Sequence, residues 1–151
     1  MSRQNINLAE SDFIVVKEDF SRYLVEDGTI LRAKIVLRKI FRSPLTDATG
    51  YPTQMGFDTL NVVSAFVQQP LKRTPSSTPA DPNIDKSNEL KFTVMEEKYQ
   101  EYLMADGFRV TIKPTMVKVF RYDKYNDFGE PVYSVNLQAI TNVERMVTTG
   151  S

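Results

Sequence analysis

Ten lysine and arginine residues lie on two stretches of the chain, 29–42 and 108–124, in a pattern that could bind a nucleic-acid backbone. Basic groups hold phosphates, and bases stack on aromatic rings that lie near them. The pattern therefore predicts, as one alternative, a single-stranded nucleic-acid-binding β-barrel. The basic residues are Arg32, Lys34, Arg38, Lys39, Arg42, Arg109, Lys113, Lys118, Arg121 and Lys124, and the nearby aromatic residues are Tyr23, Phe41, Tyr102, Tyr122 and Tyr125.

The overall composition favours a second interpretation of the same charges. Nineteen basic residues balance nineteen acidic ones, whereas a protein that mainly grips polyphosphate carries a positive net charge. The stretches that precede the basic ones, residues 17–26 and 96–106, are acidic. An acidic strand beside a basic strand forms cross-strand ion pairs and a neutral surface. We therefore prefer charge pairing to nucleic-acid binding.

Catalytic and metal-binding chemistry has little support in the residue types. The chain contains no cysteine and no histidine, which excludes disulfides, thiol nucleophiles and zinc-thiolate sites and removes the commonest general base. The loop 123–130 is rich in oxygen ligands, but Asn and Asp are also turn residues that bond to their own backbone. Glu18 and Glu97 recur at matching positions without a flanking catalytic signature. We expect no enzyme activity, no cofactor and no metal site.

Two segments of the chain have similar sequences. Residues 27–42 read DGTILRAKIVLRKIFR, and residues 106–121, offset by 79, read DGFRVTIKPTMVKVFR. Aligned without gaps at this offset, residues 13–52 and 92–131 share thirteen identical positions. Among them are Tyr23 and Tyr102 and the Asp-Gly pair of each segment. The offset predicts an internal duplication.

A proline-rich segment separates the two copies. Residues 70–90 hold four of the eight prolines, among Ser, Thr, Asp and Asn, and such a composition has too few apolar groups to order itself. Fused copies joined in this way are expected to pack as a pseudo-twofold pair. The predicted organisation is an N-terminal arm (1–12), a first β repeat (13–69), a linker or surface loop (70–91), a second β repeat (92–148) and a tail (149–151).

The Asp-Gly pair of each copy predicts a β-hairpin, because Asp-Gly tolerates the positive φ angles of a two-residue type I′ turn. Such a turn places Leu24 opposite Leu31 and directs both toward the core, with Tyr23 on the other face. It also places Arg22 and Glu101 on the core face. A short helix is the alternative for 17–26 and 96–105, since apolar residues recur there at i, i+3 and i+4. Strand is the preferred interpretation.

Further strands are expected after the Gly-x-Pro loop of each copy. The segments FDTLNVVSAFV and VYSVNLQAITNV are rich in β-branched and aromatic residues, which are typical of strands. A three-stranded sheet alone leaves its apolar face in water, so two must pack together. We predict an all-β, internally duplicated, pseudo-twofold sandwich or barrel of six to eight strands, built from two β-meander repeats.

We expect this scaffold to be a non-catalytic structural or protein-interaction module that works in an oligomer or larger assembly. Sheet edges invite strand addition, so the expected partner is another protein or further copies of the chain. The expected contact residues are Tyr122, Tyr125, Tyr133, Arg32, Lys34 and Lys113.

The same sequence bears on location. The longest apolar stretches are far shorter than a membrane span, so we expect no membrane contact. The first residues, MSRQNINLAESDF, contain no apolar run, so we expect no secretory signal. The lack of cysteine fits a reducing cytoplasm.

Overall fold

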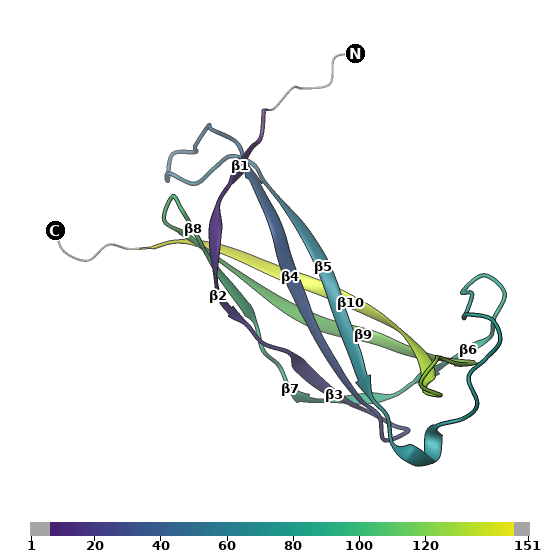
Figure 1. The fold of residues 1–151 in the computed structure, drawn as a ribbon. Coiled ribbons are helices and arrows are strands. Elements are labelled where there is room, and N and C mark those ends of the chain that lie inside the picture. Colours follow the sequence, from purple (N-terminus) through teal and green to yellow (C-terminus); the bar gives the residue numbers. More distant parts are fainter. Residues whose placement is uncertain (1–6, 147–151) are drawn as a thin grey trace.

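The computed structural model describes residues 7–146, and this part of the chain is all-β. Ten strands form two antiparallel sheets of five strands each, and the described residues contain one short 3-10 segment, Gln69–Leu71, but no α-helix. No helix between residues 7 and 146 has the length and apolar character needed to cross a membrane. Figure 1 shows the long strands of one sheet crossing over those of the other.

The first sheet is built around one long strand, β4 (Ile30–Arg42). One side of β4 pairs with β5 (Met55–Phe66) over its whole length. The other side pairs near its start with β3 (Ser21–Val25) and near its end with β1 (Ala9–Ser11). On the same side, β7 (Phe92–Glu96) pairs with β3 and forms the outer strand there.

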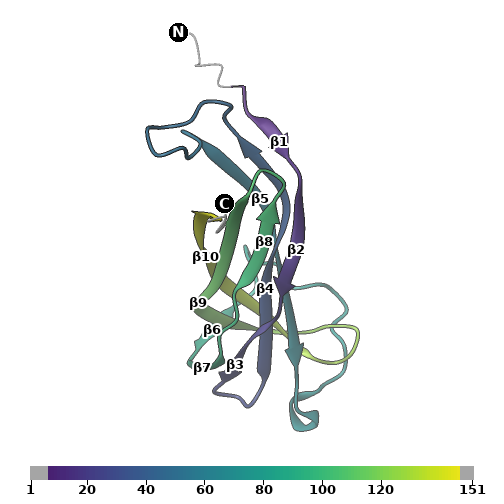
Figure 2. The same ribbon diagram turned by 90° about the vertical axis from the view of Figure 1, so that its left-hand side faces the viewer.

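The second sheet repeats this plan around β9 (Phe108–Tyr125). One side of β9 pairs with β10 (Pro131–Arg145), and the other pairs with β8 (Gln100–Met104) and β6 (Ser87–Leu90). On the side of β8, the outer strand is β2 (Phe13–Glu18), which pairs with β8. The chain therefore passes from one sheet to the other at five steps, β1–β2, β2–β3, β5–β6, β6–β7 and β7–β8. Figure 2 shows β1 running on into β2 beside β8.

The pairing registers of the two sheets differ by a constant offset in residue number. Tyr23 pairs with Leu31, and 79 residues later Tyr102 pairs with Val110. The outer strands β7 and β2 keep the same offset. Val25 pairs with Phe92 in the first sheet, and Met104 pairs with Phe13 in the second, so each pair holds residues that match at the offset of 79. Only the long outer strands depart from it, by one residue, since Phe66 faces Ile30 while Glu144 faces Arg109.

Side chains from both sheets share the hydrophobic core, so burial of apolar surface holds the sheets together. The alternation along β4 and β9 directs every second residue inward. In one cluster Ile35, Leu37 and Ile40 of the first sheet meet Tyr102, Met104, Phe108, Val110 and Ile112 of the second. In the other cluster Tyr23, Val25, Leu31 and Ala33 of the first sheet meet Met116 and Val119 of the second.

The hairpin between β3 and β4 has a three-residue loop, so the predicted two-residue type I′ turn is wrong. The Val25 amide donates to the Thr29 carbonyl at 2.8 Å, and the Gly28 amide donates to the Val25 carbonyl at 2.8 Å. Gly28 has φ +91°, but no non-glycine residue among those described has positive φ, so Asp27 does not adopt the type I′ conformation. The geometry is that of a type I turn closed by a left-handed glycine.

This longer loop shifts the register of β3 by one residue, which exchanges the two faces of the strand. Leu24 lies opposite Ile30 rather than Leu31 and is 40% exposed, whereas Tyr23 is fully buried. Arg22 and Glu101 consequently lie outside the core. The inward face predicted for β4 is confirmed, because Leu31, Ala33, Ile35 and Leu37 are buried.

The observed strands also test the predicted helical alternative, the predicted barrel and the predicted number of strands. Residues 21–25 and 100–104 are strands, so the helical alternative is wrong. The two sheets are open rather than closed into one barrel, and they contain ten strands rather than six to eight. The extra strands are the short ones, including β1 and β6, whose pairing partners lie far away in sequence. The predicted tail 149–151 lies outside the described residues.

The turn geometry gives a matched pair of substitutions. We expect Gly28→Ala to lower the free energy of unfolding by about 1–2 kcal/mol, because an L-residue is strained at φ +91°. We expect Gly56→Ala, in β5, to raise it by about 0.5 kcal/mol, because a Cβ there meets no atom within 4 Å and the unfolded chain loses freedom. Urea unfolding of both variants measures the difference, and a Gly28→Ala protein as stable as the parent would contradict the left-handed turn.

Candidate interaction surface

The basic residues of β4 and β9 are mostly neutralised by carboxylates. Eight of the ten basic residues on the two stretches lie within 4.0 Å of an acidic group, as charge pairing predicts. Within residues 7–146, Arg32 and Lys118 form no salt bridge. The pairs are Lys34–Glu18, Arg38–Asp58, Lys39–Glu10, Arg42–Asp106, Arg109–Glu101, Arg109–Glu144, Lys113–Glu97, Arg121–Asp27 and Lys124–Asp85.

The six predicted contact residues lie in three separate places. Arg32 and Lys34 lie on β4, where Arg32 is exposed and Lys34 sits over the Phe20 ring. Lys113 lies on the outside of the second sheet, 2.8 Å from Glu97. Tyr122, Tyr125 and Tyr133 gather near one end of the second sheet, where β9 leads into β10, and all three are half-buried. The fold therefore brings the tyrosines together but separates them from the basic residues.

Tyr133 belongs to a polar network centred on Asp27. Its hydroxyl donates to Asp27 Oδ2 at 2.6 Å, and Arg121 Nη1 donates to the same oxygen at 2.9 Å. The Thr29 amide donates to the other carboxylate oxygen at 2.9 Å. Because the phenol proton of Tyr133 goes to Asp27, the Thr29 hydroxyl donates to Tyr133 Oη at 2.7 Å. The network ties the first hairpin to the far end of the second sheet.

The same contacts fix the protonation states of this network. Burial opposes charge on Asp27, but the hydrogen bonds from Tyr133, Thr29 and Arg121 outweigh it and lower the pKa of the carboxyl group. Burial, followed by the hydrogen bond to Asp27, raises the pKa of Tyr133 to about 12. Near neutral pH the carboxylate is charged and the phenol is protonated. The network is suited to holding strands together rather than to proton transfer.

A second buried polar group fills a break in the edge of β4. Between the segments paired with β3 and β1, the amides of Ile35 and Leu37 have no neighbouring strand. Ile35 N donates to Gln100 Oε1 at 3.0 Å, and Leu37 N donates to the Tyr102 hydroxyl at 3.1 Å. The Tyr102 hydroxyl itself donates to Glu18 at 2.7 Å. Residues of β8 thus replace the missing strand.

The matching break in β9 needs fewer partners. Pro114 stands where β4 has Ile35 and has no amide hydrogen to satisfy. Ser21, at the position that matches Gln100, is correspondingly short, and its hydroxyl donates to the Lys98 carbonyl at 3.1 Å. Gln100 makes the equivalent bond from Nε2 to the Asp19 carbonyl at 2.8 Å. Sequence reasoning treated Asp27 only as a turn residue, although the recurrence of Asp-Gly at the offset of 79 marked it. It missed Gln100, which the repeat does not mark because Ser21 stands at the matching position.

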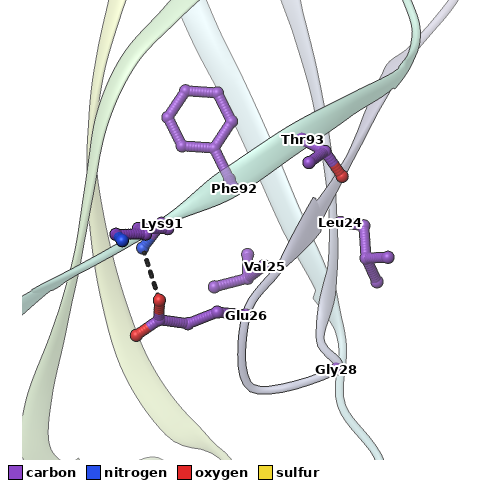
Figure 3. Close-up of a pocket in the computed structure, with 7 residues that line it drawn as sticks. All are labelled: Leu24, Val25, Glu26, Gly28, Lys91, Phe92 and Thr93. Atoms are coloured by element: carbon purple, nitrogen blue, oxygen red, sulfur yellow. Dashed lines mark hydrogen bonds between the residues drawn. The ribbon is translucent and has the colours of Figure 1, made fainter.

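An open apolar hollow lies beside the first hairpin. Its volume is about 270 Å³, and Figure 3 shows it between β7 and the end of β3. The Glu26 carboxylate accepts a hydrogen bond within this lining, because the backbone amide of Lys91 donates to Glu26 Oε2 at 3.1 Å. The hollow can receive an apolar side chain, but its lining offers no converging acid and base. The lining residues are Leu24, Val25, Glu26, Gly28, Lys91, Phe92 and Thr93.

The long outer strands β5 and β10 are the most distinctive surface. Each pairs with a neighbour on one side only among residues 7–146. No charged residue occurs at 59–66 of β5 or at 131–143 of β10. Apolar side chains are nonetheless exposed there, including Leu60 at 48% and Ile140 at 53%. A long uncharged edge is a template for pairing with another strand.

Two of the short outer strands, β2 and β7, carry the usual protection against such pairing. In β2 a bulge follows Val15, and the strand ends with Lys17 and Glu18. In β7 a bulge adds Met95 opposite the Arg22–Tyr23 step, and the strand ends with Glu96. Bulges and charges blunt a sheet edge. β5 and β10 lack charges along their central parts, and the extra residues of their irregular pairings, Arg38, Val117 and those between Arg121 and Tyr125, lie on β4 and β9.

Comparisons of the chain with protein-family models, with curated proteins and with solved structures find no match.

Proposed function

We propose that the chain is a non-catalytic β-rich structural or protein-interaction module, and that it belongs to an oligomer or larger assembly whose members pair with its outer strands. The single observation that carries this proposal is the length and lack of charge of β5 and β10 at 59–66 and 131–143. In strand addition, main-chain hydrogen bonds supply affinity and side chains supply selectivity.

The polar clusters support a structural role over a catalytic one. The carboxylates of Asp27 and Glu18 and the hydroxyl of Tyr102 are engaged by hydrogen bonds within the chain. A catalytic group must instead reach a substrate from a cleft. Of the predicted contact residues, Arg32 is the one whose charge is exposed and unpaired within residues 7–146, so it is the first we assign to a partner. Nucleic acid, the alternative partner, would have to bind basic strands whose charges are largely paired.

We also infer that the architecture is an internally duplicated, pseudo-twofold sandwich in which the copies exchange strands. The thirteen identities at an offset of 79 support this inference, as does the recurrence of strand registers at the same offset. The exchange would place β2 beside the second copy and β7 beside the first. A duplicated module of this kind would present two related edges, β5 and β10, to its partners.

Hydrogen exchange tests the proposed function on the native complex. We expect peptides covering 55–66 and 131–145 to exchange more slowly in the complex isolated from cells than in the purified chain, because a partner strand would bond their free amides. The peptide covering β4, which is paired on both sides over most of its length, is the internal control. Equal exchange of 55–66 and 131–145 in the two samples would contradict the proposal.

A further inference from the structure

We propose that β10 pairs antiparallel with β10 of a second copy of the chain, around a twofold axis at Ala139, so that two five-stranded sheets become one sheet of ten. This inference rests on the proposed function and names the partner as the chain itself. It depends on the direction of the free backbone groups, on the order of side chains along the strand and on the absence of like charges that would face each other across the axis.

The backbone of β10 offers a regular free edge as far as Val143. The next amide on this edge, that of Arg145, donates to the Tyr51 hydroxyl at 3.2 Å, so the free edge ends there. The Met146 amide donates to the Gly107 carbonyl at 2.9 Å, which makes these opposite residues a hydrogen-bonded pair. In an antiparallel ladder such pairs alternate. The backbone N–H and C=O groups of even-numbered residues of β10 therefore point toward β9, and those of odd-numbered residues point toward the free edge. The bulge does not interrupt this alternation, because its extra residue is Val117 of β9.

The sequence of β10 complements itself when it is read backwards. Residues 135–143 read VNLQAITNV, which has Val and Asn at both ends and Ala139 at the centre. Antiparallel pairing about Ala139 also keeps inward residues opposite inward residues, as a twofold axis perpendicular to the sheet requires. The opposed pairs are Val135 with Val143, Asn136 with Asn142, Leu137 with Thr141, Gln138 with Ile140, and Ala139 with itself.

The outward row of this segment is free to meet a partner. Asn136, Gln138, Ile140 and Asn142 are all exposed. Ala139, the residue on the axis, has a side chain that is small enough to approach its own copy closely. Antiparallel neighbours lie about 4.5–5.5 Å apart between Cα atoms.

The charges on and beside β10 permit this pairing. Residues 135–143 carry no charge. On the adjacent strand, Lys113 lies beside Ile140 and Lys118 beside Asn136. Across the axis, Ile140 meets Gln138 of the second copy, which lies beside Thr115. Asn136 meets Asn142 of the second copy, which lies beside Thr111. No two like charges therefore become neighbours. β5 has no such symmetry, since reversing 59–66 opposes Thr59 to Phe66.

The size of the contact predicts a reversible dimer. Nine residues at about 3.4 Å each span about 30 Å, and a sheet is roughly 10 Å thick, so the two copies together bury roughly 600 Å². This falls in the weak, transient class of interfaces. The five odd-numbered residues form about ten main-chain hydrogen bonds across the axis, which is the number a standard interface carries.

Analytical ultracentrifugation of the purified chain over a wide concentration range tests the pairing. We expect a monomer–dimer equilibrium, and we expect Ala139→Pro to weaken it at least tenfold because the amide on the axis is lost. Ala65→Pro, the same change at an odd-numbered position of β5, is the control that leaves the dimer unchanged. A wild-type chain that stays monomeric at millimolar concentration, or a dimer unaffected by Ala139→Pro, would overturn the proposal.

A pair of exposed double variants tests the register without a proline. Asn136→Glu with Asn142→Lys places opposite charges across the axis twice, so we expect it to dimerise at least as well as the wild type. Asn136→Glu with Asn142→Glu places like charges there, so we expect it to dimerise at least tenfold more weakly. Equal dimerisation of the two variants would overturn the register. If the purified chain stays monomeric while 131–145 is protected in the native complex, self-pairing fails and the proposed function stands.

Discussion

Asp27→Ala is expected to lower the free energy of unfolding by about 3 kcal/mol. The Asp27 side chain is only 8% exposed and accepts hydrogen bonds from Arg121, Tyr133 and the Thr29 amide. Its removal leaves a guanidinium and a phenol partly buried without their acceptor, and unpaired buried polar groups are costly. The expected loss lies at the low end for buried pairs because Arg121 still reaches water.

Asp106→Ala is the matched control for this substitution. Asp106 stands 79 residues later in the second hairpin and pairs with Arg42, but its side chain is 33% exposed. Exposed ion pairs contribute at most about 1 kcal/mol, so we expect a loss of that size. Urea unfolding measures both variants, and similar losses would mean that the buried network does not tie the hairpin to the second sheet.

The pH dependence of stability gives an independent readout of the same network. Folding lowers the pKa of Asp27 below its unfolded value of about 3.9. The carboxylate therefore contributes stability that is fully present above about pH 5 and is lost as the pH falls through the folded pKa. We expect Asp27→Asn to be less stable than the wild type at pH 7 and to lose less stability between pH 5 and pH 2. A parallel acid decline in both proteins would contradict this assignment.

The sequence predicted the all-β class and the inward face of β4, because both depend on local alternation. Leu31, Ala33, Ile35 and Leu37 lie two residues apart, so one pleated strand directs all of them to one side. The face of β3 was not predicted correctly, because Asp-Gly fits both a two-residue type I′ turn and a three-residue loop ending in a left-handed glycine. The choice between them moves Tyr23 into the core and Leu24 out of it.

The crossing of β2 and β7 between the sheets could not be predicted from the sequence. Phe13–Glu18 and Phe92–Glu96 have the composition of strands, but local composition does not say which distant strand will pair with them. The candidate surface was missed for a related reason. β5 and β10 are recognisable as strands, yet an edge is defined by a missing neighbour, which only the assembled sheet reveals. The basic residues of β4 and β9 are visible in the sequence, but most of them are paired with carboxylates in the folded chain.

Tyr102→Phe is expected to lower the free energy of unfolding by about 1–3 kcal/mol, because one hydroxyl satisfies two groups. The phenol oxygen accepts from Leu37 N at 3.1 Å and donates to Glu18 at 2.7 Å. Leu37 N lies in the break between β3 and β1, where no strand can replace the lost acceptor. The phenyl ring keeps the packing of Tyr102 against Phe13, so the loss reports the hydroxyl alone.

Tyr23→Phe tests whether that loss comes from the hydrogen bonds or from the ring position. Tyr23 is as fully buried as Tyr102 and occupies the matching position, but its hydroxyl has no hydrogen-bond partner among residues 7–146. Replacing an unbonded buried hydroxyl removes a desolvated polar group, so we expect this variant to be as stable as the wild type or slightly more stable. Thermal unfolding of the two variants side by side measures the contrast. Equal destabilisation would mean that the Tyr102 hydroxyl does not substitute for a strand at the break in β4.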